Sequence, residues 1–481
     1  MLLWILIFRS AGDHMYSKKV YDVAVIGAGA SGTLIASQFS KYASPDKRLA
    51  LIGAGSRPAR GVAYETPYLA NLLNVPAGNM SAFPDDREHF VRWLAPRVTG
   101  SDGGTFAPRR LYGDYLAGIL DKTLKSEMVT LVDATATDLT LHGDIWNVHL
   151  QDGTTIAARS VVLAIGNALI PKAPLDVSHI APFYRGNPWA ADAIQELHPT
   201  APVLLIGTGL TTVDVALSLR ESGHKGPIHA VSRHGRLYRD HKPYRQQPLS
   251  ELPDEFHSPL AALRWTRAAI QKQKNTDGDW RAVIDSLRPH TAQIWQGWSR
   301  KQRGSFLRHA RNLWDIHRHR MAPEVAAQLN QLLADGVLVI HAGRLLKAET
   351  VGASARITVR LSKSGDTIDV TVDRVINCTG PTRNYAKTDI PLIARMRTQG
   401  WLTPDQLQLG VETDGDGRLI SADGTSISTL FAIGPLRIPS LFESIAMPEI
   451  RGQADDLAQL LSSALLEEKQ VCAAESAAEK S

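Results

Sequence analysis

Three glycines near the start of the chain have the type and spacing of a phosphate-binding turn. Gly27, Gly29 and Gly32 follow the apolar run 23–26, which is typical of a strand buried on both faces. Gly27 permits a tight strand-to-helix turn, Gly29 lets the backbone approach a pyrophosphate, and Gly32 lets helix and strand pack closely. Together with Ser31, they predict a dinucleotide site at a helix N-terminus. A glycine-rich loop without a ligand is the alternative.

The same pattern occurs a second time in the chain. The apolar run 202–206 opens into Gly207 and Gly209, and Thr212 stands where the third glycine is usual. This replacement loosens helix–strand packing but keeps the phosphate turn. Two such turns predict two nucleotide sites in one polypeptide, with a flavin in the first and a nicotinamide in the second.

The residues after the second strand of each unit indicate how the ribose is bound. In the first unit Gly53 stands where Asp or Glu usually contacts a ribose hydroxyl. In the second unit the strand ends in Ser232 and Arg233, and no acid follows. Because an arginine at this point suits a 2′-phosphate, the sequence favours NADPH over NADH.

Glycine-terminated strands follow stretches of alternating polar and apolar residues. Residues 138–157 and 345–372 alternate with short turns and predict two β-meanders. Apolar strands then end at Gly166 and Gly380, and one more ends at Gly434. These three glycines are expected to contribute to cofactor binding.

The order of these segments predicts an α/β fold with two Rossmann-like dinucleotide-binding domains, β-meanders and a helical insertion. An amphipathic helix is expected over residues 449–465. The expected division is an N-terminal extension at 1–19, an FAD-binding domain at 20–198 and 345–465, an NAD(P)-binding domain at 199–344 with the insertion at about 250–335, and a flexible tail at 466–481.

Polar residues between these units are candidates for chemistry. Asn74 and Asn79 lie in an apolar, turn-rich stretch, where they could hydrogen-bond a flavin edge or cap turns. His317 and His319 are two residues apart and do not share a helix face, so no metal site is expected. Packing and anion contacts are the plainer roles, with His317 a candidate for proton transfer. Arg318 or Arg320 could bind the oxygen atoms of an anionic substrate.

Composition narrows the class of protein. The chain has 481 residues, a net charge of +5 and a basic block between Arg233 and Arg320. Such a block can bind nucleic acid. Here prolines and tryptophans interrupt the block and it follows a nucleotide-binding fold, so contacts to an anionic cofactor or substrate are favoured. A solvated basic face is the other alternative. The first eight residues are too few to span a membrane, and Met15 is a second candidate start.

Cysteine usage bears on redox chemistry. The chain contains two cysteines and no C-x-x-C, which excludes a dithiol redox centre. A soluble protein in a reducing cytoplasm is expected, with no membrane or nucleic-acid partner.

Several longer motifs resemble the bacterial FAD/NAD(P)-binding proteins of the HpyO and YdhS type. They are residues 61–64, 72–77 with 80–81 and 85–86, 305–309, 314–320 and 442–451. The resemblance spans about residues 20–465, and more distantly the layout is similar to flavin-containing monooxygenases and lysine/ornithine N-hydroxylases. Pro435 departs from the pattern, because two-site flavoenzymes commonly carry an Asp there.

The resemblance implies a monooxygenase that uses FAD, NADH or NADPH, and O2 on a small molecule. Within the family, the HpyO type is an FAD-dependent urate hydroxylase that forms 5-hydroxyisourate in purine degradation, so urate is the first expected substrate. Asn74, His317 and Arg320 are the candidate catalytic residues. N-hydroxylation of an amine, or a flavin-binding redox sensor without turnover, are the alternatives. The sequence leaves the oligomeric state open.

Overall fold

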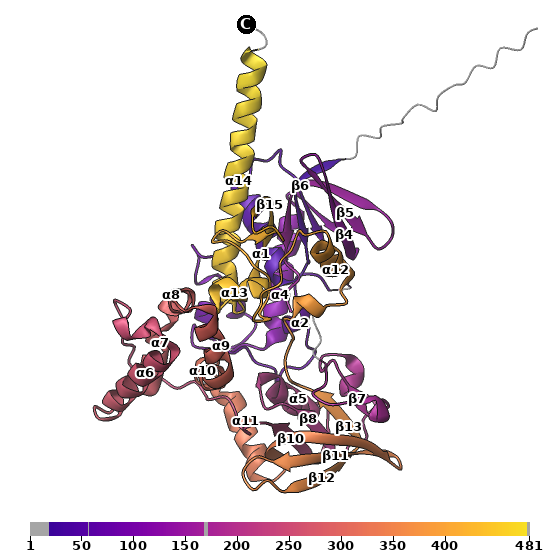
Figure 1. Ribbon diagram of the computed structural model, residues 1–481, viewed down its shortest axis with the longest axis vertical. Coiled ribbons are helices and arrows are strands. Elements are labelled where there is room, and N and C mark those ends of the chain that lie inside the picture. Colours follow the sequence, from indigo (N-terminus) through magenta and orange to yellow (C-terminus); the bar gives the residue numbers. More distant parts are fainter. Residues whose placement is uncertain (1–18, 56, 168–171, 479–481) are drawn as a thin grey trace, which may run out of the picture.

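The computed structural model describes residues 19–55, 57–167 and 172–478, with the backbone alone over 467–478. The first eighteen residues, with the candidate start at Met15, lie outside the described part. Two β-sheets, one above the other in Figure 1, organise the molecule, and a group of helices lies to one side of them.

The first sheet contains the first glycine turn. Its strands run in the order β14-β15-β6-β1-β2-β3, and the hairpin of β4 and β5 joins it through β6. The bounds are β1 Val20–Ile26, β2 Leu49–Ile52, β3 Val129–Val132, β4 Ala136–His142, β5 Ile145–Leu150, β6 Thr155–Leu163, β14 Arg418–Ile420 and β15 Ser426–Ala432. Strand β1 pairs in parallel with β2 and β6, and its residues from Val23 to Ile26 are all buried. Both faces of this sheet are therefore covered, as the apolar run predicts.

Helices cover one face of this sheet and the first meander covers the other. The helical face consists of α1 (Ala30–Tyr42), α4 (Arg109–Leu124) and α14 (Met447–Ala478). The opposite face packs against β4, β5 and α12 (Pro391–Thr398), with Trp146 completely buried. Shorter helices α2 (Gly61–Tyr64) and α3 (His89–Leu94) lie between β2 and α4 in the sequence.

The second sheet contains the second glycine turn. Its strands run in the order β12-β11-β10-β9-β8-β13-β7. The bounds are β7 Tyr184–Arg185, β8 Val203–Ile206, β9 Ile228–Ser232, β10 Leu338–Val351, β11 Ser354–Leu361, β12 Thr367–Val372 and β13 Arg374–Asn377. Helices α5 (Leu210–Glu221) and α11 (Pro323–Ala334) pack on one face, and the second meander packs on the other. The predicted fold class and both predicted meanders are confirmed.

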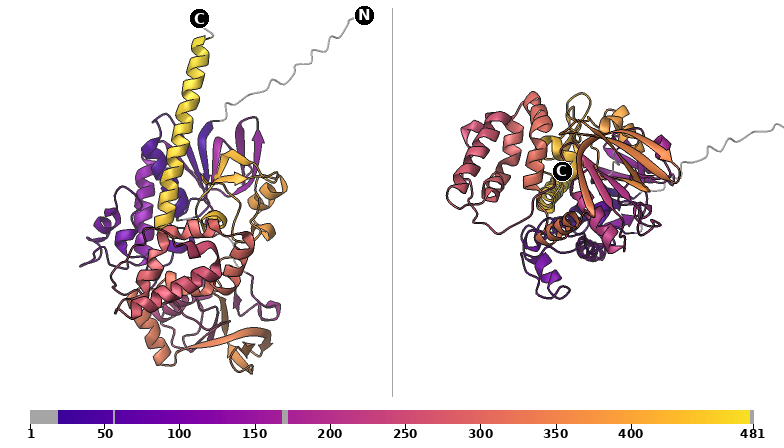
Figure 2. Two further views of the ribbon diagram at one scale, coloured as in Figure 1. Left: turned by 60° about the vertical axis from the view of Figure 1, so that its left-hand side comes forward. Right: turned by 90° about the horizontal axis from the view of Figure 1, so that it is seen from below.

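The predicted helical insertion is also confirmed. It contains α6 (Pro259–Lys274), α7 (Trp280–Ser286), α8 (Thr291–Gly297), α9 (Arg300–His309) and α10 (Arg311–Arg318). Figure 2 shows these helices on the side of the molecule away from the strands. Their aromatic core includes Trp295, Trp298 and Phe306, and it reaches Ile438 of the short helix α13 (Ile438–Leu441). The insertion is thus anchored to the chain that returns to the first sheet.

Two of the predicted ranges differ from the structure. The predicted FAD-binding domain includes residues 345–377, but β10 pairs with β9 and β13 pairs with β8 in the second sheet. Strands β11 and β12 join the same sheet through β10, which continues from its parallel pairing with β9 into the meander. The predicted flexible tail after residue 465 is helical as far as Ala478, and α14 extends beyond the body in Figure 1. The tail is rich in Ala, Glu and Lys, which favour helix. Within the described residues, no helix is long and apolar enough to cross a membrane.

Candidate dinucleotide and substrate cleft

The first glycine turn leaves no room for side chains at two of its positions. A Cβ on Gly27, whose φ is +117°, would lie 2.4 Å from the carbonyl oxygen of Ala164. A Cβ on Gly32 would lie 1.9 Å from the carbonyl oxygen of Gly27. By contrast, the nearest atom to a Cβ on Gly29 is the Cα of Gly61, at 3.6 Å. The turn is therefore tight on its protein side and open beside Gly29, as a phosphate cradle requires.

The residues of this turn fit the diphosphate of an FAD. Helix α1 has Gly29 as its N-cap, and its first intrahelical hydrogen bond runs from Thr33 N to Gly29 O at 2.9 Å. The N–H groups of the preceding residues, including Ser31 and Gly32, have no intrahelical acceptor, so they can bind an anion. Gly434, with φ of +72°, lies close by, since a Cβ there would be 3.2 Å from Ser31 Oγ. Gly166 also has a positive φ, of +61°.

The structure explains the missing acid after β2. A Cβ on Gly53 would lie 2.6 Å from the backbone nitrogen of Ala28, so a side chain cannot be accommodated there. An acid from the next strand lies nearby instead, because the carboxylate of Asp133, just after β3, accepts the N–H of Gly55 at 3.2 Å. The sequence has no local signal for Asp133, which is 80 residues further along the chain than Gly53.

The second glycine turn has the same geometry. A Cβ on Gly207, whose φ is +118°, would lie 2.8 Å from the carbonyl oxygen of Cys378. Gly209 is the N-cap of α5, and Thr212 is buried in its first turn. The Ser232 hydroxyl holds the neighbouring loop, because Ser232 Oγ lies 2.8 Å from Thr208 Oγ1 and accepts the N–H of Gly235 at 3.1 Å.

A large cleft lies next to the second turn and reaches the first domain. Its volume is about 1210 Å³, and it is lined by residues of the first domain, the second turn, the helical insertion and the start of α14. Of the residues predicted from the sequence, it is lined by Asn74, Asn79, Gly209, Arg233, Arg318, Arg320 and Gly380. The structure thus brings residues from both predicted domains and the insertion to one cavity.

His317 does not belong to this cleft. Its Nδ1 donates a hydrogen bond to the carbonyl of Leu313 at 2.7 Å, and its ring packs edge-on against Trp280. It lines a separate apolar pocket of about 250 Å³ inside the insertion. His317 therefore lies on the opposite face of α10 from the cleft and is not brought together with Asn74 and Arg320; its role in proton transfer stays a prediction.

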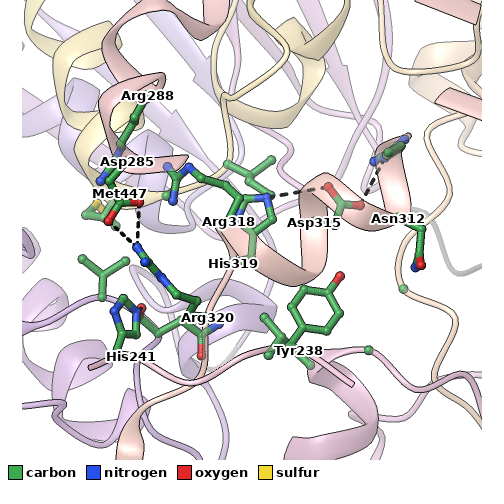
Figure 3. A pocket seen from close by; sticks show the side chains of 18 of the residues that line it. Tyr238, His241, Asp285, Arg288, Asn312, Asp315, Arg318, His319, Arg320 and Met447 are labelled. Carbon is green, nitrogen blue, oxygen red and sulfur yellow. Dashed lines mark hydrogen bonds and ion pairs between the residues drawn. The ribbon is translucent and has the colours of Figure 1, made fainter. Parts of the chain in front are cut away.

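Arg320 lies in the cleft wall and is held by Asp285. Its Nη2 donates to Asp285 Oδ1 at 2.7 Å, and the same carboxylate also accepts a hydrogen bond from the hydroxyl of Tyr244. Figure 3 shows Arg320 reaching from the end of the insertion toward Asp285, with Met447 and His241 beside them. The sequence contains no local signal for this pair, since Asp285 belongs to α7 and is brought to Arg320 by helix packing.

Arg318, the other predicted anion-binding arginine, is already paired. Its Nη2 lies 2.8 Å from Glu443 Oε2 and 3.8 Å from Glu449 Oε1. This ion pair joins α10 to the segment that leads into α14. Arg318 is therefore part of the structural connection between the insertion and the first domain, while Arg320 remains the candidate for ligand contact.

His241 is held in its neutral form in the cleft. A carbonyl can only accept, so His241 Nε2 donates to the carbonyl of Asn74 at 3.0 Å and carries the proton. Burial, and to a lesser extent the positive charge of Arg320, lower the pKa of His241 to about 4, although the hydrogen bond to Asn74 acts in the opposite direction. Near neutral pH the ring is uncharged, and its Nδ1 presents a lone pair.

Comparison with known proteins agrees with this architecture. Residues 24–168 match the model of a family described as FAD-NAD(P)-binding. No curated protein sequence matches the chain.

Solved structures share the fold over nearly the whole chain. An L-lysine 6-monooxygenase from Pseudomonas syringae superposes with a TM-score of 0.65 at 16% identity, covering 92% of this chain and 99% of that one. A Kutzneria ornithine N-hydroxylase, solved with FAD, NADP+ and L-ornithine, has a TM-score of 0.61 at 15% identity, covering 92% and 99%. The FAD-bound cadaverine monooxygenase DfoA from Erwinia amylovora has a TM-score of 0.62 at 11% identity, covering 92% and 95%. The chain therefore has a two-domain FAD/NAD(P)-binding flavoprotein fold, and residues 24–168 match an FAD-NAD(P)-binding family.

Proposed function

We propose that this protein is an FAD- and NAD(P)H-dependent monooxygenase that hydroxylates a small molecule, with an amine nitrogen as the first candidate acceptor. The reaction consumes NAD(P)H, a proton, O2 and substrate, and yields NAD(P)+, water and hydroxylated product. The observation that carries the proposal is the shared cleft, in which Gly209 of the second turn and Asn74 of the first domain line one cavity. The fold that the chain shares with amine and amino-acid monooxygenases supports the choice of acceptor.

The chain's own residues have the tasks of binding and orientation. The turn from Gly27 to Gly32 would hold the diphosphate of FAD, and the turn from Gly207 to Thr212 would hold that of NAD(P)H. Bound FAD would supply hydride acceptance and O2 activation, which no protein side chain provides. Arg233 is exposed at the edge of the cleft and is the candidate for a 2′-phosphate. Asn74 and Gly380 would line the space in which flavin and nicotinamide meet.

Hydroxylation of urate to 5-hydroxyisourate is the second candidate. The observation that favours it is the number of arginines that line the cleft, namely Arg109, Arg233, Arg236, Arg288, Arg308, Arg311, Arg318, Arg320 and Arg383. Urate is anionic near neutral pH and presents several acceptor oxygens, which guanidinium groups bind in pairs. An amine substrate without an acid group does not use this property of the cleft.

The experiment that tests the proposal starts from the absorbance spectrum of the purified chain. We expect a bound flavin, anaerobic bleaching by NADPH faster than by NADH, and O2 uptake that a substrate accelerates. Amines and urate are then compared as accelerators, with the hydroxylated product identified by mass spectrometry. Protein that cannot be reconstituted with flavin would contradict the proposal. Reduction that takes hours and that none of these compounds accelerates would favour the redox sensor instead.

A further inference from the structure

Arg320 has hydrogen-bonding capacity that the protein does not use. The side chain is 3% exposed, and its Nη2 is bound to Asp285. Its Nε and Nη1 are buried and have no hydrogen-bond partner within the described structure. The centroids of the Tyr244 and Trp280 rings each lie 5.9 Å from the guanidinium carbon. The rings flank the guanidinium but do not replace an oxygen atom as the acceptor of its N–H groups. Buried donors of this kind call for an acceptor.

His241 adds an acceptor beside these donors. Arg320 is close enough to depress the pKa of His241, and both residues line the cleft. Because Nε2 of His241 is committed to the carbonyl of Asn74, Nδ1 is the nitrogen that can accept a hydrogen bond from a ligand. Asn74 itself lines the same cleft from the first domain. Donor and acceptor thus stand next to a residue expected near the flavin.

The carboxylates of the cleft are already in use. Asp285 and Asp315 are the acids among the described residues that line it. Asp285 is bound by Arg320 and Tyr244. Asp315 lies 3.4 Å from Arg311 Nε and 4.0 Å from His319 Nε2, as Figure 3 shows for His319. An ammonium group that entered the cleft would therefore have to compete with an existing cation for its partner.

We infer that Arg320 and His241 form the anchoring site for an acidic group of the substrate, either a carboxylate or a deprotonated ring imide next to an N–H. An acceptor oxygen of the substrate binds the free edge of the Arg320 guanidinium, and a substrate N–H or O–H donates to Nδ1 of His241. The inference rests on the proposed function, and it narrows the substrate to organic acids, including amino acids and urate-like rings. Diamines without an acid group are excluded as substrates.

The test measures binding alone, so that it does not depend on turnover. Flavin-loaded full-length protein is titrated calorimetrically, without NAD(P)H, with L-lysine, cadaverine and urate. L-lysine and cadaverine differ by one carboxylate. Urate instead carries a deprotonated ring imide next to an N–H as its acidic group. We expect at least one of the two acids to bind, and cadaverine to bind at least tenfold more weakly than that acid. Which acid binds distinguishes the carboxylate from the ring imide.

A double variant removes the anchor without leaving a buried charge. In Arg320→Gln/Asp285→Asn both members of the ion pair become neutral amides, so no unpaired buried charge destabilises the fold. We expect its affinity for the bound acid to fall at least tenfold, about 1.4 kcal/mol, with flavin content and near-ultraviolet circular dichroism unchanged. Arg264→Gln is the matched control, because Arg264 is exposed on α6 and does not line the cleft.

The outcomes separate this inference from the proposed function. Binding of cadaverine as tight as that of the acid that binds, no binding of either acid, or full affinity in the double variant would each overturn the anchor. If an acid binds through Arg320 but never accelerates O2 uptake, the anchor stands and the proposed function fails. If NADPH reduces the flavin and O2 uptake responds to a compound without an acid group, the monooxygenase stands and the anchor fails.

Discussion

The guanidinium of Arg318 lies 2.8 Å from Oε2 of Glu443, and the two side chains are 10% and 9% exposed. The carboxylate also accepts a hydrogen bond from the indole N–H of Trp314 at 3.3 Å. This buried ion pair connects the end of α10 to the segment before α14, and so links the helical insertion to the first domain beside the cleft.

We expect Glu443→Gln to lower the free energy of unfolding by about 3 kcal/mol, because it leaves the buried guanidinium of Arg318 with the more distant Glu449, at 3.8 Å, as its charged partner. Urea denaturation of the purified protein measures the change. Glu349→Gln is the control, since Glu349 pairs with Lys347 at 2.6 Å where the side chains are 40% and 63% exposed. That variant should lose less than about 1 kcal/mol. Equal losses in the two variants would show that Arg318 is not held as the structure indicates.

Alanine substitutions in the two glycine turns are predicted to affect different cofactors, flavin in the first turn and NADPH in the second. Gly32→Ala places a Cβ 1.9 Å from a carbonyl oxygen of the first turn, so the purified protein should contain little or no flavin. Gly207→Ala distorts the second turn against Cys378, so flavin should be retained while reduction by NADPH slows. Absorbance spectra and stopped-flow reduction distinguish the two effects.

Gly118→Ala on α4 is the control for these substitutions. Nothing lies within 4 Å of a Cβ at Gly118, so the variant should keep both properties and gain about 0.5–1 kcal/mol of stability. Flavin loss in Gly207→Ala but not in Gly32→Ala would reverse the assignment of the two turns.

Arg233 is predicted to select NADPH. It follows β9 at the edge of the cleft, and no ion pair links it to a carboxylate of the described chain. Arg233→Gln should raise the KM for NADPH at least tenfold, because a charged hydrogen bond contributes about 1.5–3 kcal/mol, and should leave the KM for NADH nearly unchanged. Steady-state NAD(P)H oxidation measures both constants. A parallel change for the two coenzymes would mean that Arg233 does not contact the 2′-phosphate.

Asp214 predicts a pH-dependent stability. Burial in α5 raises the pKa of its carboxyl from 3.8 to about 6, although Arg109, 3.1 Å away, acts in the opposite direction. The folded state therefore binds this proton more tightly than the unfolded state, and the resulting stability, present at low pH, is lost as pH rises from about 4 to about 6. Asp214→Asn removes the effect, so its stability relative to the wild type should increase by about 3 kcal/mol across that range.

Urea denaturation between pH 4 and pH 7 measures this difference. Asp214→Glu keeps an ionisable group and should keep the pH dependence, which makes it the control. A difference between Asp214→Asn and the wild type that stays constant over this pH range would contradict the raised pKa.

Much of the fold follows from local patterns that the sequence displays directly. The apolar run before Gly27 must be buried on both faces, and only glycine satisfies the contacts at Gly27 and Gly32, so strand, turn and helix are evident without a structure. The alternating residues of the two meanders are equally local, because a period of two places every second side chain on the same face. The end of the second domain could not be located in this way, since β10 serves both as a parallel strand beside β9 and as the first strand of a meander.

The composition of the cleft was decided by tertiary structure. His317 and Arg320 are three residues apart in one basic motif, yet α10 places His317 in an apolar pocket, while Arg320, beyond its end, lies in the cleft wall. The partner of Arg320, Asp285, comes from α7, and Tyr244, which also binds Asp285, comes from the loop after β9. No sequence pattern links these segments. The sequence by itself determined the two nucleotide turns, because glycine is required by contacts within a few residues and a neighbouring strand. Which charged side chains remain available to a ligand depends on ion pairs between distant segments, and only the packing of the insertion against the first domain decides that.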